Sequence, residues 1–356
     1  MRDRTPHLFV DISSHGLGHL AQTAPVLNRL AELLPDLRLT LRSGLPLAAL
    51  RRRIRPAFDH LAATSDFGYA MIDALTIDHA ATRARYHAAH RDFARAVTAE
   101  AAMLKRLQVD AVFANVAYLP LAGAACAGVP ALAMCSLNWA DLYAHYYGAD
   151  AIHGEMLAAY RTARFLRTTP GMTMPGLDRL SVIGPVAAPG ADRRQELRHK
   201  LGAAATARLV LIALGGVPAR LPVERWPALP DTRWLVPADW QVARPDMPTF
   251  EPLDWPFADL LRSVDVVITK PGYGTFTEAV CNRTAVIYQR RDHWPEQDCL
   301  IDWLRVHGRC AEVSATALAT GDLGDALAAC LRDAVPSGPE FNGAEQAAQQ
   351  LRGLLA

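Results

Sequence analysis

Several features are scarce in this chain of 356 residues, and each scarcity excludes a class of protein. No run of about 18 apolar residues occurs, so the sequence predicts no transmembrane segment. The 37 Lys and Arg residues nearly balance the 36 Asp and Glu residues, which leaves a formal net charge of +1. Because this balance gives no extended positive field, no nucleic-acid partner is expected, and any anionic ligand must be held locally.

Cysteine is also sparse and lacks the spacing of a metal site. The six cysteines include no Cys-x-x-Cys pair, which favours core thiols over a redox or metal role. His87 and His90 have the spacing to share a metal on one helix face, but no third ligand is near them in sequence. A solvated helix face is therefore predicted there, and no metal or cofactor is expected.

The N-terminus has no sign of a secretory signal. Met1–Pro6 leads into a short apolar segment that Asp11 interrupts, and no small-residue cleavage site follows. A cytoplasmic, unprocessed protein is therefore predicted.

What the chain has in abundance is alternation between short apolar runs and helical periodicity. This pattern is typical of βα units around a parallel sheet, and the length suggests about two domains. A stripe of apolar residues predicts a first helix that begins close to His19, with Pro25 in its first turn. The segment 80–108 predicts one long helix or a broken pair. Strands are predicted at 7–13, 37–43 (half exposed), 109–114, 130–136, 181–186, 208–214, 232–236, 264–269 and 285–288.

Proline and glycine at 186–191 mark the best linker in the chain. They predict an N-terminal α/β domain over 1–186 and a C-terminal one over 187–356. The final helix, near 345–355, is a candidate to pack back on the N-terminal domain.

The first candidate site is the loop Ser14–His19, between the first strand and the first helix. In an open parallel sheet, ligands bind outside the carboxyl ends of the strands. Gly16 and Gly18 let the backbone approach a ligand, and the pattern is neither a dinucleotide-binding nor a Walker loop. A histidine at each end can accept a proton from an attacking hydroxyl. The alternative is a tight turn with two incidental histidines.

A second candidate is the segment 269–278, again where a strand passes into a helix, here predicted to begin at Thr275. Lys270, Gly272 and Gly274 with a helix N-terminus suit a diphosphate, and Glu278 is placed to accept hydrogen bonds from ribose hydroxyls. The alternative is a capping box formed by Thr275 and Glu278, which needs no ligand.

Two further candidate loops follow strands of the same predicted sheet. The segment 290–297 brings Arg291, Glu296 and Gln297 beside the lysine loop, where the last two can reach sugar hydroxyls, although Pro295 with Glu296 also makes an ordinary helix start. Gly215 and Gly216 form another candidate phosphate loop. Two domains facing each other across a cleft would bring all four loops together.

The chain resembles the GT-B glycosyltransferases of the MurG type, and it is more similar still to the glycosyltransferase-like half that precedes the kinase in plant L-arabinokinases. The resemblance covers most of the chain, and its motifs occur in the same order. They are His15–His19, Asp73–Asp78, Ser136–Asp141, Lys270–Glu278 and Arg290–Asp292.

The resemblance implies two Rossmann-like domains facing across a cleft, and it implies roles for individual residues. Glu278 matches the glutamate that holds the donor ribose, and Glu296 or Gln297 matches the position that holds the donor sugar. His19 matches the histidine assigned to catalysis or phosphate contact, and Leu253 falls where the backbone meets the nucleobase.

The sequence therefore predicts metal-independent transfer of a sugar from a nucleotide donor, a UDP-sugar, to an acceptor hydroxyl. His19 is the expected base, with His15 as second choice. The predicted donor-binding set is Gly18, Gly215, Gly216, Leu253, Lys270, Gly272, Gly274, Thr275, Glu278, Arg291, Glu296 and Gln297.

The predicted acceptor side lies in the first domain, and each member has a plain alternative. Trp139 is as well explained by a place in the core, and the aspartates by helix capping. The set is Asp73, Asp78, Asn138, Trp139 and Asp141. A nucleotide-sugar 2-epimerase on the same fold and a non-catalytic sugar-nucleotide binding protein are the alternative functions.

Overall fold

The computed structural model describes residues 5–73, 75–216 and 219–356. Met1–Arg4, which entered the prediction of an unprocessed N-terminus, and Ala74, within one of the motifs, lie outside the described residues. The described chain forms two compact units. The first takes its residues from Met1–Ile72, Ile77–Val186 and Glu340–Ala356, and the second from Asp73–Thr76 and Ala187–Pro339.

The first unit is built on a parallel sheet that, in the described residues, has seven strands in the order β3-β2-β1-β4-β5-β6-β7. Buried aliphatic residues dominate β1 and β4 at its centre, as expected of strands covered on both faces. The strands are β1 (His7–Ile12), β2 (Arg38–Arg42), β3 (Asp59–Leu61), β4 (Ala111–Asn115), β5 (Ala131–Cys135), β6 (Arg164–Thr168) and β7 (Leu180–Ile183).

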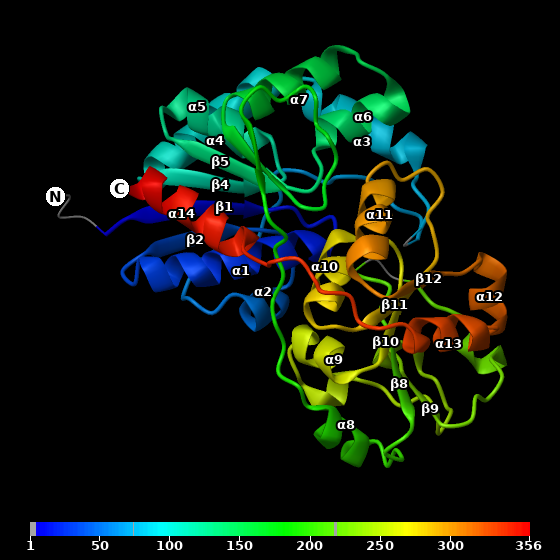
Figure 1. Ribbon diagram of the computed structural model, residues 1–356. Helices are drawn as coiled ribbons and strands as arrows, with labels where there is room; N and C mark the ends of the chain where they lie inside the picture. Colours follow the sequence, from blue (N-terminus) through cyan, green and yellow to red (C-terminus); the bar gives the residue numbers. More distant parts are fainter. Residues whose placement is uncertain (1–4, 74, 217–218) are drawn as a thin grey trace. The chain divides into compact units, whose positions relative to one another are not determined.

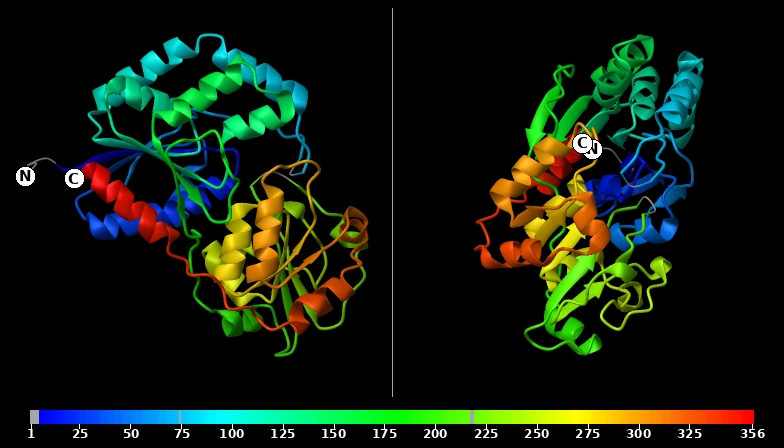
Figure 2. Two further views of the ribbon diagram at one scale, coloured as in Figure 1. Left: turned by 45° about the horizontal axis from the view of Figure 1, so that its top comes forward. Right: turned by 90° about the vertical axis from the view of Figure 1, so that its right-hand side faces the viewer.

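Helices cover both faces of this sheet (Figures 1 and 2). One face carries α1, α2 and the C-terminal α14, which lies along α1. The other carries α3 to α7, in which α4 packs on α5 and α6 on α7. Their bounds are α1 (Leu17–Leu33), α2 (Leu47–Arg53), α3 (His79–His90), α4 (Phe93–Leu107), α5 (Leu119–Ala127), α6 (Trp139–Tyr147), α7 (Ala151–Arg161) and α14 (Gly343–Leu355).

The second unit repeats the plan with a parallel sheet that has five strands in the described residues, in the order β12-β11-β10-β8-β9. The strands are β8 (Arg208–Ile212), β9 (Thr232–Leu235), β10 (Val266–Thr269), β11 (Ala285–Tyr288) and β12 (Cys310–Glu312). The helices are α8 (Arg194–Lys200), α9 (Phe257–Ser263), α10 (Tyr273–Cys281), α11 (Gln297–His307), α12 (Ala315–Thr320) and α13 (Gly324–Arg332), with 3-10 turns η1 (Val223–Arg225), η2 (Ala238–Trp240) and η3 (Glu251–Leu253).

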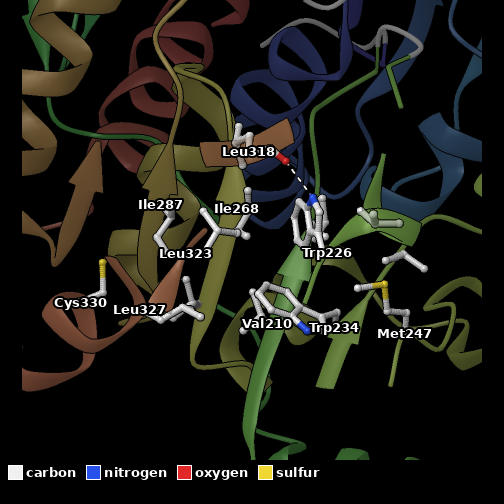
Figure 3. Close-up of a cluster of buried hydrophobic side chains, with 14 of the residues drawn as sticks. Val210, Trp226, Trp234, Met247, Ile268, Ile287, Leu318, Leu323, Leu327 and Cys330 are labelled. Carbon is white, nitrogen blue, oxygen red and sulfur yellow. Dashed lines mark hydrogen bonds between the residues drawn. The ribbon is translucent and has the colours of Figure 1, made fainter. Parts of the chain in front are cut away.

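The core of the second unit shows what holds α12 and α13 against its sheet (Figure 3). Leu318 of α12, Leu327 of α13 and Leu323, the N-cap residue of α13, pack on aliphatic side chains of β8, β10 and β11. Trp226 closes the cluster, and its indole Nε1–H donates to the carbonyl of Leu318 over 2.8 Å. Burial of these side chains fixes the sheet and thereby the loops at its carboxyl edge.

Several local predictions differ from the structure. Pro25 lies well inside α1, which begins at Leu17, so the helix tolerates the loss of one N–H donor instead of placing it in the first turn. The strand predicted as half exposed, β2, is buried from Leu39 to Arg42 because the Arg42 side chain is paired with carboxylates. The segment 80–108 is a broken pair, α3 and α4.

Two strands of the first sheet have no counterpart in the sequence prediction. β3 is short, and β6 carries Arg164 and Arg167, so neither forms a clear apolar run.

Candidate functional site

Each unit has one place where the order of its strands reverses. In the first sheet the reversal falls between β1 and β4, and in the second between β10 and β8. A crevice opens at such a point in an open parallel sheet, because successive connections leave in opposite directions. The histidine loop follows β1, and the lysine loop follows β10, so both predicted loops lie at these points.

His19 is the best-defined side chain at the first point, the histidine site. Its Nδ1 lies 2.9 Å from Oδ1 of Asn115, the last residue of β4. The backbone N–H of Ser13 donates to the carbonyl of Asn115 over 2.8 Å, which joins the ends of the two strands. His19 is only 7% exposed, and this burial lowers its pKa to about 4.

A buried chain of amides fixes which nitrogen of His19 carries hydrogen. Gln22 donates from Nε2 to Ser136 Oγ (3.2 Å), and Asn115 donates from Nδ2 to Gln22 Oε1 (3.4 Å). Oδ1 of Asn115 then accepts, so Nδ1 of His19 is the donor. Its Nε2 is consequently left with a lone pair, which is the state that a proton acceptor needs.

Trp139, at the start of α6, contacts both His15 and His19. The ring centroid of Trp139 lies 5.4 Å from that of His15 and 5.7 Å from that of His19, both in edge-on geometry. Its Nε1–H donates to Asp66 Oδ2 over 2.7 Å, and the side chain is fully buried. Trp139 therefore lies in the core, as the alternative held, and its ring contacts both candidate histidines.

Asp66 is an element of the site that the sequence analysis missed. It is 9% exposed, and burial together with the nearby charge of Asp11 raises its pKa to about 7. Asp11 itself belongs to a buried network in which Arg42 donates to Asp11 and to both carboxylate oxygens of Glu100. Nothing in the sequence marks Asp66, because its environment comes from residues far along the chain.

The predicted acceptor-side residues other than Trp139 are engaged in local turns. Asp78 caps α3 by accepting from Ala81 N–H, and Asn138 caps α6 by accepting from Asp141 N–H. The exposed Asp73 accepts from Leu75 and Thr76 N–H. Asp141 also accepts from Asn138 Nδ2 over 2.8 Å, and burial raises its pKa. Helix capping and turn formation thus account for much of this set.

The second site, the lysine site, is organised around Lys270 at the end of β10. Burial lowers the pKa of Lys270 well below its usual range, and the neighbouring charge of Arg291 lowers it further, against an opposing effect of Glu296. Its Nζ lies beside Gly215, where an added Cβ would be 3.5 Å away; Gly215 has φ +93°. Among the described residues, none accepts a hydrogen bond from the Lys270 ammonium.

The helix that follows this loop begins earlier than predicted. α10 starts at Tyr273 with Gly272 as its N-cap, and no side chain caps it. Thr275 is therefore inside the helix and Glu278 lies beyond the first turn, which excludes the capping box that was the alternative reading. Glu278 is 1% exposed. Gly274, also in this helix, is buried.

The loop after β11 brings a second cation to the lysine site. Arg291 donates from Nη2 to the carbonyl of Pro271 over 2.8 Å, which ties this loop to the lysine loop. Its guanidinium stacks 4.8 Å from the ring centroid of Trp294, whose Nε1–H donates to Glu296 over 3.2 Å. The amide of Gln297 bonds both backbone groups of Arg291, so it shapes the loop.

Three predicted donor-binding residues, Gly18, Leu253 and Gly216, remain to be placed in the structure. A Cβ at Gly18 would meet no atom within 4 Å, so the start of α1 faces open space. Leu253 ends η3 and is half-buried. Gly216 follows Gly215 after β8 and is exposed.

No cluster of three His, Cys, Asp or Glu side chains suited to a metal occurs in the described ranges. His90, predicted on a solvated face, is instead buried: Nδ1 lies 2.6 Å from Glu155 Oε2, and Nε2 lies 2.8 Å from Tyr118 Oη. In the part of the chain that the structure describes, every helix falls short of the length and apolar character that crossing a bilayer requires.

Comparison with known proteins gives matches in sequence and in fold. No protein-family model matches the chain. L-arabinokinase of Arabidopsis thaliana is 26% identical over 307 residues, which is 83% of this chain and 29% of that protein. The chain thus spans less than a third of the length of this curated relative.

Solved glycosyltransferase structures match nearly the whole chain. A UDP-glucosyltransferase from Polygonum tinctorium has a TM-score of 0.61 at 15% identity, covering 100% of this chain and 94% of that one. MurG of Acinetobacter baumannii has a TM-score of 0.55 at 14% identity, covering 98% and 99%. The fold expected from the sequence resemblance is confirmed: this chain has the GT-B fold of the glycosyltransferases.

Proposed function

We propose that this protein is a glycosyltransferase that moves a sugar from a nucleotide-sugar donor, a UDP-sugar, to a hydroxyl of an acceptor. The observation that carries the proposal is Lys270, a half-buried lysine with no hydrogen-bond acceptor among the described residues, beside a helix N-terminus that no side chain caps. A cation in this state is stabilised by an anionic ligand, and free N–H groups at a helix N-terminus suit phosphate oxygens.

The lysine site would hold the donor. Lys270, Arg291 and the first N–H groups of α10 supply positive charge where a diphosphate leaves, without requiring a metal. Glu278 and Glu296 are carboxylates that can accept from ribose and sugar hydroxyls. Gly215 can present its backbone to the same phosphates, and its φ of +93° is a conformation that other residues adopt only with strain.

The histidine site would supply the base. The proton of the acceptor hydroxyl passes to Nε2 of His19, and the acceptor oxygen forms a bond to the anomeric carbon of the sugar. The bond from that carbon to the diphosphate breaks, and its electron pair leaves with the diphosphate. Because the pKa of His19 is about 4, the ring is unprotonated at neutral pH and available for this step.

Calorimetry with UDP, dTDP and GDP tests the donor site. UDP is expected to bind with heat that Lys270→Met removes, and absence of binding by all three nucleotides would contradict the proposal. Incubation of the UDP-sugars with cell extract then tests transfer: UDP release should require both the extract and His19. Release without extract would indicate an epimerase, and binding without release a sensor.

A further inference from the structure

The two histidines that follow β1, His15 and His19, carry their ring hydrogen on different nitrogens. We propose that His15 donates a hydrogen bond from Nε2 to an oxygen of the ligand, so that it is a partner of the base His19 and not a second base. This inference rests on the proposed function and divides its histidine site into one acceptor and one donor.

The first step is the contact of His15 with the backbone. The N–H of Tyr69 donates to Nδ1 of His15 over 3.3 Å. A backbone N–H can only donate, so Nδ1 must be the nitrogen with the lone pair, and the neutral ring carries its hydrogen on Nε2. A ring in this state offers a donor at Nε2 and cannot accept a proton there.

The second step is that the donating backbone is fixed in place. Gly68 has φ +58°, and a Cβ on it would come within 2.7 Å of the His15 ring. The buried hydroxyl of Tyr86 donates to the carbonyl of Gly68 over 3.0 Å. Only glycine adopts this backbone against the imidazole without strain, so the Tyr69 N–H faces Nδ1 as a feature of the fold.

The third step is the contrast with His19, whose Nδ1 donates to Asn115 and leaves the lone pair on Nε2. Trp139 contacts both rings and is itself anchored by a hydrogen bond to Asp66. One Nε2 therefore carries a lone pair and the other a hydrogen. A transfer reaction needs both groups: His19 can take the proton of a hydroxyl, and His15 can donate a hydrogen bond to another oxygen.

The oxygen that accepts this hydrogen bond belongs either to the diphosphate of the nucleotide-sugar or to the molecule that receives the sugar. His15 would recognise the lone pair that both oxygens carry. The substitution His15→Gln keeps an N–H donor, whereas His15→Phe removes it and retains a ring. We expect His15→Gln to keep kcat/KM within about 10-fold of the wild type, and His15→Phe to lose about 100-fold.

The control is His19→Gln, which cannot act as a base and should be at least as impaired as His15→Phe. Weaker UDP binding in His15→Phe assigns the oxygen to the donor, and a raised KM for the acceptor alone assigns it to the acceptor. Equal loss in His15→Gln and His15→Phe would overturn the inference, provided that thermal unfolding shows both variants folded.

Nitrogen-15 spectra of the imidazoles give a test that needs no activity. His15 is expected to show hydrogen on Nε2 and His19 on Nδ1 near pH 7. Hydrogen on Nδ1 of His15 would overturn the inference whatever UDP does, whereas failure of UDP to bind would contradict the proposed function and leave the ring states measurable.

Discussion

The histidine site and the lysine site lie at equivalent points of two similar sheets, but their polar groups are satisfied in different ways. In the histidine site, the amides of Gln22 and Asn115 and one carboxyl oxygen of Asp66, Oδ2, bond to other protein groups. In the lysine site, Lys270 and Arg291 bring two cations together, and no described residue accepts from the lysine. The first site is organised before any ligand arrives, and the second is completed by one.

This difference fits a catalytic role for the histidine site and a ligand-binding role for the lysine site. A base needs a fixed orientation and a defined hydrogen, which buried hydrogen bonds provide. A binding cation without a partner destabilises the free protein and gains most from its ligand. Removing a group from each site should therefore change different quantities.

The largest effect is expected from His19→Gln. This substitution removes the lone pair at Nε2, and loss of a general base typically costs 10²- to 10⁴-fold, so we expect kcat to fall by about 1,000-fold. UDP affinity should stay within about threefold, measured by calorimetry. A parallel loss of UDP affinity would indicate that His19 contributes mainly to binding of the nucleotide-sugar and not to proton transfer.

Lys270→Met should have the opposite signature. UDP affinity is expected to fall by about 10- to 100-fold, the range for a charged hydrogen bond. The free protein should become more stable toward urea by about 1 kcal/mol, because a half-buried ammonium from which no described residue accepts a hydrogen bond is replaced by an apolar chain of similar length. Lower stability in Lys270→Met would contradict the contrast between the two sites.

The third prediction concerns the pH dependence of stability. Asp66 has its pKa raised to about 7 by burial, so its folded form binds a proton that the unfolded chain releases near 3.8. The free energy of unfolding should therefore fall by up to about 1.4 kcal/mol per pH unit between about pH 4 and 7 because of this group. Its contribution is constant above that window.

His19 acts in the reverse direction over much of the same range. Its pKa is lowered to about 4, so the unfolded chain binds more protons between about pH 4 and 6.5, and stability rises with pH. Asp66→Asn removes the falling contribution and should leave the rising one visible in urea unfolding across pH 4.5 to 7.5. An unchanged profile would show that Asp66 is not protonated in the folded state.

The sequence predicted the two sheets and the loops at their carboxyl edges because glycine loops and apolar runs are local signals. It did not find Asn115, Asp66 or Tyr69 as elements of the histidine site, because each reaches a histidine only through pairing of distant segments. It also placed the start of α10 two residues late, since Tyr273 and Gly274 look like loop residues until the strand before them is fixed. Hydrogen placement on the two rings depends on these contacts and has no sequence signal.

The smallest effect is expected from Asn115→Asp, and it tests how the histidine site sets its base. A carboxylate at Nδ1 of His19 stabilises the protonated ring, so the pKa of His19 should rise by about 1 unit from about 4. The acidic limb of kcat/KM should move upward by the same amount, while UDP affinity stays unchanged because the lysine site is untouched. Burial keeps the wild-type ring unprotonated, and the hydrogen bond to the Asn115 amide opposes this only in part. A carboxylate at the same place would make the ring more basic and leave less of it unprotonated at a given pH. An acidic limb that does not move would show that the observed pKa belongs to another group, and that the amide chain from Ser136 to His19 is not what tunes the reaction.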